Sequence, residues 1–281
     1  MEQKQPLRLM GIWAHPDDET FSMAGSLARA TMNGNLAAIV SATRGEEGKI
    51  ADPSLATEAN LGHVRERELR AACAAVGVTD VSFLDYVDGH LAEADEQEAI
   101  GRIVYQLRRF RPDVVVTFAA NGGYGHVDHM AIHRLTLAAI EAAPDAARYA
   151  GQISEGLAPH RVRKVYYGGM IRERLLEMRA EAQKHGRDFI PGGDEATIPV
   201  EEMGTPLSEV TTFVRLTDEE FAAKRAAMGA HATQMPADSP FASATPEQMR
   251  EFMGTEVFVL VPPPVSATTY PVPEDDLFAG L

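Results

Sequence analysis

Five consecutive residues near the start of the chain, His15-Pro16-Asp17-Asp18-Glu19, combine side chains that bind metals with side chains that transfer protons. His15 and Asp18 are three residues apart, so a helical turn would direct both side chains to one spot. An imidazole nitrogen and a carboxylate oxygen form a suitable donor pair for a divalent transition metal. The alternative is that Asp17 and Glu19 only cap a following helix, whose dipole favours acidic residues at its start. The position directly after an apolar, strand-like segment favours the metal site.

A second polar cluster begins at Asn121 and contains three histidines. His126 and His129 repeat the three-residue spacing, and His133 follows one helical turn later. The glycines between Asn121 and His126 allow the backbone to turn tightly and approach a ligand. A catalytic zinc usually has three protein ligands and one open position, so the His-Asp pair of the first cluster needs one histidine from the second. His133 competes for that place, but we expect it to pack on its helix or to support the site.

The remaining polar groups of the two clusters suit a hydrolysis reaction. A divalent metal lowers the pKa of water, which makes water a nucleophile near neutral pH. A neighbouring carboxylate can accept the proton of that water. A second histidine can stabilise the developing oxyanion or protonate a leaving amine. The two clusters therefore predict metal-dependent hydrolysis that removes an acyl group from an amine.

The two clusters need a fold that brings them together, and the spacing of apolar residues predicts one. Short apolar segments alternate with segments of helical periodicity. This alternation is typical of an α/β fold, here a Rossmann-like, mostly parallel sheet with helices on both faces. Ligands of such sheets bind beyond the carboxyl ends of the strands, where both clusters lie. The predicted strands are Leu7–Ala14, Leu36–Ala42, Val81–Leu84 and Val114–Phe118, and the predicted helices are Thr20–Asn33, Val64–Val76, Glu96–Phe110 and Val127–Ala143.

The second half of the sequence is less regular. We predict that residues 1–170 form an α/β metal-binding catalytic core. Residues 171–281 are predicted to form a lid or substrate wall, with a C-terminal helix and strand that complete the same domain. A stretch rich in glycine, proline and acidic residues indicates a loop or lid, and the tail that contains Pro271 and Pro273 should be extended. The further predicted elements are strands Arg163–Met170 and Val257–Val261, helices Arg172–His185 and Asp218–Ala232, the loop Asp188–Leu207 and a stop at Pro262-Pro263-Pro264.

Charge and composition limit the partners of the chain. The formal net charge of -15 repels phosphate backbones and anionic lipids, so we expect neither nucleic acid nor membrane as a partner. No apolar stretch has the length of a membrane span, and the first residues do not resemble a signal peptide. The single cysteine, Cys73, excludes an intrachain disulfide and suits a core position in a cytoplasmic protein. The sequence allows a homo-oligomer.

Together the two clusters resemble the PIG-L/LmbE-like family of N-acetylglucosamine deacetylases. This family includes the deacetylases of mycothiol and bacillithiol synthesis and the mycothiol-conjugate amidases. Val127 replaces a proline that is usual in the family, and residues 171–208 match poorly. Substrate-specific walls are expected in that region, which we call the wall segment. The two main motifs are Ala14–Glu19 and Gly123–His129, and the weaker ones are Thr43–Gly48, Arg65–Leu69 and His231–Gln234.

The resemblance implies a metal site and a base in the first cluster. His15, Asp18 and His129 would bind Zn²⁺, and Fe²⁺ would accept the same ligands. Asp17 would be the general base that acts on the water. We assign no role to His231, which also suits a core or helix-end position.

The resemblance also implies groups that act on the substrate. His126 would be the acid or oxyanion stabiliser, oriented by Asp128, and Tyr124 would sit over the acyl oxygen. Arg65 and Asp88 would hold the sugar or its polar substituent. Arg65 equally suits a solvated position on a charged helix face. Asp88 stands in Tyr-Val-Asp-Gly-His, where relatives often have Asp-Ser-Gly, so its match is weaker.

These observations predict an enzyme that removes the acetyl group from a small N-acetylglucosamine-type substrate. The alternative within the same chemistry is an amidase that acts on a larger thiol conjugate. A metal-bound binding protein without catalysis is disfavoured because Asp17 is present. A nucleotide-binding protein is disfavoured because the first predicted strand is not followed by a Gly-x-Gly-x-x-Gly motif.

Overall fold

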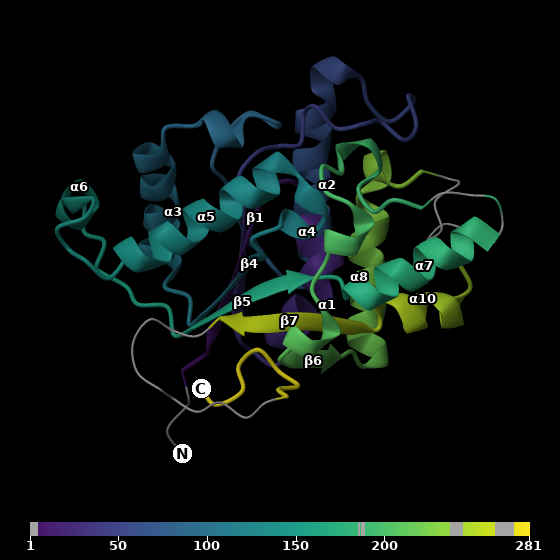
Figure 1. Ribbon diagram of the computed structural model, residues 1–281. Helices are drawn as coiled ribbons and strands as arrows, with labels where there is room; N and C mark the ends of the chain where they lie inside the picture. Colours follow the sequence, from purple (N-terminus) through teal and green to yellow (C-terminus); the bar gives the residue numbers. More distant parts are fainter. Residues whose placement is uncertain (1–4, 185, 187–188, 237–243, 262–272) are drawn as a thin grey trace.

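The strands of the protein form a seven-stranded sheet in a computed structural model that describes residues 5–184, 186, 189–236, 244–261 and 273–281 (Figure 1). The strand order is β3-β2-β1-β4-β5-β7-β6. The first five strands pair in parallel, and β7 runs antiparallel to both β5 and β6. The predicted α/β fold with a mostly parallel sheet is confirmed. The strands are β1 (Arg8–Trp13), β2 (Leu36–Ser41), β3 (Asp80–Phe83), β4 (Val114–Phe118), β5 (Lys164–Gly169), β6 (Thr212–Arg215) and β7 (Thr255–Val261).

Helices cover the two faces of the sheet as the connections require. Crossovers between parallel strands are right-handed, so α1 and α2 lie on one face, whereas α3 and α5 lie on the other. On the first face α8 packs against both α1 and α2. The helices are α1 (Asp18–Met32), α2 (Leu61–Ala75), α3 (Glu96–Phe110), α4 (Gly122–Gly125), α5 (Val127–Ala142), α6 (Ala150–Ser154), α7 (Arg172–Lys184), α8 (Asp218–Ala230) and α10 (Pro246–Met253). Short 3-10 turns are η1 (Glu58–Asn60), η2 (Leu91–Glu93), η3 (Gly193–Glu195), η4 (Val200–Glu202), η5 (Leu207–Glu209) and η6 (Ala232–Gln234).

The position of β1 in the sheet explains why polar side chains are found directly after it. The chain leaves β1 toward β2 on one side, and β4 pairs with β1 on the other side. The connections therefore diverge at the carboxyl ends of β1 and β4, which is where sheets of this kind bind ligands. Apart from Arg8, the residues of β1 and β4 are buried, and the Trp13 and Phe118 rings at their ends pack edge to face with centroids 4.8 Å apart. This rigid floor carries both polar clusters.

Some elements differ from the sequence prediction. The short elements α4, α6, α10 and β6 were not predicted, and β7 begins two residues earlier than expected. The predicted loop region contains the short turns η3 and η4, and η5 begins at its last residue. A four-residue strand or a single helical turn is too short to show a clear apolar period, which explains these omissions. The predictions for His185, Asp188, Pro262-Pro263-Pro264 and Pro271 lie outside the described residues.

The C-terminal tail is attached to the sheet near the starts of β5 and β6. The buried carboxylate of Glu274 lies 2.7 Å from Nζ of Lys164 and accepts hydrogen bonds from the hydroxyls of Tyr166 and Thr212. These partners belong to β5 and β6, so the tail joins two strands of the antiparallel part. Within the described residues, no helix has both the length and the apolar character needed to cross a membrane.

Candidate metal centre and active site

The turn between β1 and α1 holds the first cluster. Asp17, at the start of α1, has the left-handed backbone angles φ 103 and ψ -29. The carboxylate of Asp18 accepts the backbone N–H of His15 at 2.8 Å, which closes the turn on itself. His15 and Asp18 are both buried, at 7% and 9% exposure. The predicted three-residue spacing therefore places both side chains at the carboxyl end of β1.

The loop after β4 brings the second cluster to the same place. Gly122 has a φ of 61, and a methyl group there would lie 2.8 Å from Cβ of His129. Glycine is therefore required for the backbone to pass so close to the histidine. The Gly122 carbonyl lies 3.0 Å from Nδ1 of His129, so this nitrogen donates and Nε2 carries the lone pair. The ring of His129 stacks on Phe118 at the end of β4.

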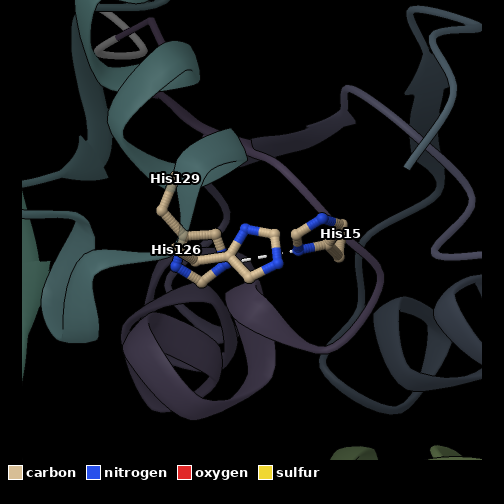
Figure 2. Close-up of side chains that lie close together, drawn as sticks. All are labelled: His15, His126 and His129. Carbon is tan, nitrogen blue, oxygen red and sulfur yellow. Dashed lines mark hydrogen bonds between the residues drawn. The ribbon is translucent and has the colours of Figure 1, made fainter. Parts of the chain in front are cut away.

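His15, Asp18 and His129 converge as the sequence predicted. Nδ1 of His15 lies 3.2 Å from Nε2 of His129, as the dashed line in Figure 2 marks. The Asp18 carboxylate lies 3.4 Å from Nε2 of His129 and 3.8 Å from Nδ1 of His15. The outer nitrogen of His15, Nε2, lies 2.8 Å from Asp88 and 3.3 Å from Asp128. Nε2 of His15 and Nδ1 of His129 each face an acceptor and therefore carry a proton. The other two nitrogens, Nδ1 of His15 and Nε2 of His129, face each other and need a proton or a cation between them.

The electrostatics of the cluster agree with that need. Burial opposes the charged form of His15, but hydrogen bonds with Asp128 and Asp88 raise its pKa to about 10. Burial and the charge on His15 lower the pKa of His129 well below its usual value. Burial raises the pKa of Asp18 against the opposing charge of His15. Without a metal the cluster thus holds a proton on His15, and two imidazoles and a carboxylate are donors that a divalent transition metal would accept in its place.

His126 and His133 have different environments. His126 lies beside the pair, and ligand atoms of His15, His126 and His129 fall within 4.8 Å of one another (Figure 2). Its Nδ1 accepts the backbone N–H of Asp128 at 3.2 Å, which leaves Nε2 as the protonated nitrogen. His133 points elsewhere, since its Nδ1 lies 2.8 Å from the Phe118 carbonyl. His133 therefore contacts the ends of β4 and β5, where its ring also lies 5.1 Å from that of Tyr167.

Two carboxylates expected to have other roles support His15. The carboxylate of Asp128 contacts His15 and accepts the N–H groups of Gly89 and Leu91, so it reaches His126 through its backbone rather than its side chain. Asp88, expected at the sugar, has one oxygen on His15 and the other 3.2 Å from the N–H donor of Glu47. Burial opposes its ionisation, but His15 lowers the pKa of Asp88 to about 2. Both side chains are buried and contact the ring of His15, and the contact of Asp88 with a sugar stays a prediction.

Arg65 is buried rather than solvated. Its guanidinium donates to the carbonyls of Pro16 and Gly45, at 2.6 and 2.8 Å, and lies 3.2 Å from the Asp17 carboxylate. A methyl group on Gly45 or Gly48 would collide with this guanidinium. The weaker motif from Thr43 to Gly48 thus forms a close-fitting loop around Arg65. The side chain of Arg65 in turn connects α2 to the turn between β1 and α1.

Comparisons with known proteins agree with this geometry. The family model described as PIG-L, GlcNAc-PI de-N-acetylase, matches residues 10–140, which include both clusters. A 1D-myo-inositol 2-acetamido-2-deoxy-alpha-D-glucopyranoside deacetylase of Thermobispora bispora is 34% identical over 98% of this chain and 98% of its own length. The chain belongs to the PIG-L family.

A second curated relative and a solved structure were also similar to this chain. A mycothiol S-conjugate amidase of Streptomyces coelicolor is 33% identical over 98% of this chain and 97% of its own length. Among solved structures, the N,N'-diacetylchitobiose deacetylase from Pyrococcus horikoshii superposes with a TM-score of 0.66 at 20% identity, over 91% of this chain and 84% of that one. The structural likeness shows that the fold is shared.

In this PIG-L chain the wall segment is joined to the second loop through Tyr124. The Tyr124 ring lies edge-on to His129 with centroids 5.0 Å apart, and burial raises the pKa of its phenol. The backbone of the wall segment donates to the carbonyls of Tyr124 and Gly123 from Thr197 and Gly204. A small apolar cluster of Leu175, Val200 and Met203 packs against the Tyr124 ring. The described part of the wall segment therefore lies beside Tyr124, whose ring contacts His129.

Sequence reasoning missed the contact between Glu19 and His231. Nε2 of His231 lies 3.1 Å from Oε1 of Glu19, and both side chains are fully buried. Burial opposes the charged ring, but the carboxylate of Glu19 raises the pKa of His231. The only sequence signal was the weak family match at His231, which gave no hint of its partner 212 residues away.

Proposed function

We propose that the protein is a metal-dependent deacetylase that hydrolyses the acetamide of an N-acetylglucosamine-type substrate. The main support is the convergence of His15, Asp18 and His129 around one point, with Asp17 on the same turn. The names of the full-length relatives support the amino-sugar substrate.

We infer that His15, Asp18 and His129 hold Zn²⁺, with Fe²⁺ as an alternative for the same donors. Their facing atoms are separated by 3.2 to 3.8 Å, and roughly 2.0–2.2 Å bonds to one zinc ion suit such separations. The metal would supply Lewis acidity that polarises the acyl oxygen and activates water near neutral pH. Asp88 and Asp128 fix the outer nitrogen of His15, which orients the ring as a ligand.

The other side chains have roles in proton transfer and substrate orientation. Asp17 accepts a proton from the attacking water. His126 donates from Nε2 to the developing oxyanion or to the leaving amine, and burial together with the charge of His15 keeps its pKa below the usual value. Tyr124 covers the acyl oxygen from the side of the wall segment. Arg65 holds the Asp17 turn, and any contact with the sugar would be additional.

We further propose that the wall segment selects the group attached to the amino sugar. The Streptomyces coelicolor relative makes an amidase of a larger conjugate a second candidate, since its identity to this chain is nearly that of the deacetylase. Both reactions use the same metal centre, so they differ only in the substrate that the wall segment admits. A cytoplasmic location is a further prediction.

An amine-release assay on metal-loaded protein tests the proposal. The substrate panel contains N-acetylglucosaminides with different aglycones and thiol conjugates with a cleavable amide. Release of acetate and amine from the N-acetylglucosaminides supports the deacetylase, and cleavage of the conjugates alone supports the amidase. Metal-loaded protein that cleaves no member of the panel would favour a binding protein without catalysis.

A further inference from the structure

Asp17 has a backbone conformation that requires support from its surroundings. Its φ of 103 lies in the left-handed region, which residues other than glycine rarely adopt. Such conformations are energetically unfavourable and persist where neighbouring contacts enforce them. The backbone N–H of Asp17 donates to Oε2 of Glu19 at 3.0 Å, and its carbonyl accepts from Thr20 and Phe21 at 2.9 and 3.1 Å. The carboxylate of Glu19 is therefore part of the support.

Glu19 is itself fixed by a residue from a distant part of the chain. His231 follows α8, and its Nε2 lies 3.1 Å from Oε1 of Glu19 and 3.2 Å from the Thr20 hydroxyl. The Thr20 hydroxyl donates to the same Glu19 oxygen. The side chain of Glu19 thus has one oxygen toward His231 and Thr20 and the other toward the Asp17 backbone.

His231 is not explained by packing alone. Its side chain is fully buried, and within the described residues its Nδ1 has no hydrogen-bond partner. A buried polar nitrogen without a partner is unfavourable, so an apolar residue would fill the same space at lower cost. The contact between Nε2 and Glu19 is what the imidazole provides and an apolar side chain would not.

We propose that His231 is a positioning residue for Asp17 and acts through Glu19. His231 fixes Oε1, which turns Oε2 to the Asp17 N–H and holds the left-handed turn. This turn lets the adjacent residues Asp17 and Asp18 reach different partners. The Asp17 carboxylate contacts Arg65, whereas the Asp18 carboxylate contacts His129. The inference rests on the proposed function in one respect, which is the role of Asp17 as the base.

A neighbouring hydrogen bond offers a matched control. Thr233 lies two residues after His231, and its N–H and hydroxyl donate to Glu68 of α2 at 2.8 and 2.6 Å. Both Thr233 and Glu68 are buried. Thr233→Val removes a buried hydrogen bond from the same segment but leaves the Glu19 contact intact.

The first test measures kcat, KM, metal content and Tm for three variants. His231→Leu should lower kcat about 10- to 100-fold at unchanged KM and metal content, as loss of an outer support typically does. His231→Gln places an N–H donor near the position of Nε2 and should restore most of kcat. Thr233→Val should lower Tm without changing kcat. A His231→Leu variant that keeps the kcat of the wild type would overturn the proposal.

The second test does not depend on turnover. Hydrogen exchange of a peptide that spans residues 14–20 reports the Asp17 N–H together with the amides of the three residues that follow it. Exchange should be faster in His231→Leu and in Glu19→Gln, because the amide of glutamine can offer its oxygen to only one of the two sides. It should be unchanged in Thr233→Val. Wild-type exchange in Glu19→Gln would refute the positioning role even if His231→Leu does not fold, and a substrate-inactive wild type would refute only the proposed function.

Discussion

Nδ1 of His15 and Nε2 of His129 face each other at 3.2 Å, although each ring has an acceptor at its other nitrogen. Without a metal, this contact requires a proton on His15, whose pKa is raised to about 10 by Asp128 and Asp88 against burial. A bound metal removes that requirement, since both lone pairs then point to one cation.

The first prediction concerns metal content. Protein purified in zinc-containing medium should contain about one metal per chain, as one set of three ligands implies. His15→Ala and His129→Ala should each lose most of this metal in elemental analysis. His133→Ala is the control, since His133 contacts the Phe118 carbonyl instead of the cluster. Equal metal loss from His133→Ala would mean that the ligand set is wrong.

A second prediction separates metal binding from proton transfer. Asp17→Asn preserves the shape of the side chain but cannot accept a proton from water. Its kcat should fall at least about 100-fold, the contribution of a positioned general base, while metal content stays at the wild-type level. Steady-state kinetics and elemental analysis on the same preparation provide both values. Full activity of this variant would exclude Asp17 as the base.

A substitution of Asp88 distinguishes two roles for its carboxylate, orienting His15 or holding the sugar. If it orients His15, Asp88→Asn should weaken metal affinity about 10- to 100-fold, which is usual for the partner of a histidine ligand. Competition with a chelator measures this affinity. If Asp88 holds the sugar instead, metal affinity should stay constant while KM rises. The 2.8 Å contact with His15 leads us to expect the first result.

Gly122 should be intolerant of a side chain. Gly122→Ala places a methyl group 2.8 Å from Cβ of His129 at a φ of 61, so the variant should lose about 1–3 kcal/mol of unfolding free energy. Denaturant unfolding checks this value. Gly229→Ala is the matched control, because an added methyl group there meets no described atom within 4 Å. Since Gly229 lies inside α8, this variant should gain about 0.5–1 kcal/mol.

The ion pair between Arg29 and Glu220 predicts a dependence of stability on pH. Burial opposes ionisation of Glu220, but hydrogen bonds from Arg29 and Thr217 lower its pKa below the usual 4.5. The stabilising contribution is therefore complete above pH 4.5 and is lost as pH falls through the lower, folded-state pKa. Glu220→Gln removes the charge but still fits the capping box with Thr217.

Melting temperatures of the wild type and Glu220→Gln should consequently differ most near neutral pH and converge in acid. The expected difference in unfolding free energy is on the order of 1 kcal/mol or less, as for other partly exposed ion pairs. A difference that stays constant across the acid range would show that the charge of Glu220 does not contribute.

The sequence predicted the elements whose signals are local. The bounds of α3 and β4 agree with the structure, because α3 starts at a capping Asp95 and ends before Pro112, and β4 is apolar throughout. The eight-residue α10 was missed even though Thr245 and Gln248 form a capping box at its start. Its apolar face is too short to be recognised by periodicity alone.

For the site too, the sequence predicted only those features whose signals are local. Both polar clusters could be placed at strand ends, which predicted that His15 and Asp18 meet one histidine of the second cluster. The resemblance to the family singled out His129. The partners of Asp88 and His231 could not be found this way. Asp88 reaches His15 across more than seventy residues and His231 reaches Glu19 across 212, so these contacts depend on how whole elements pack.

The attachment of the wall segment has a consequence for the diversity of this scaffold. Thr197 and Gly204 hold the segment to the second loop through backbone hydrogen bonds, which do not depend on side-chain identity. Its apolar contacts form a small cluster separate from the main core. If the wall segment selects the substrate as proposed, exchanging it between relatives would change the accepted molecule and leave the residues of the two polar clusters in place.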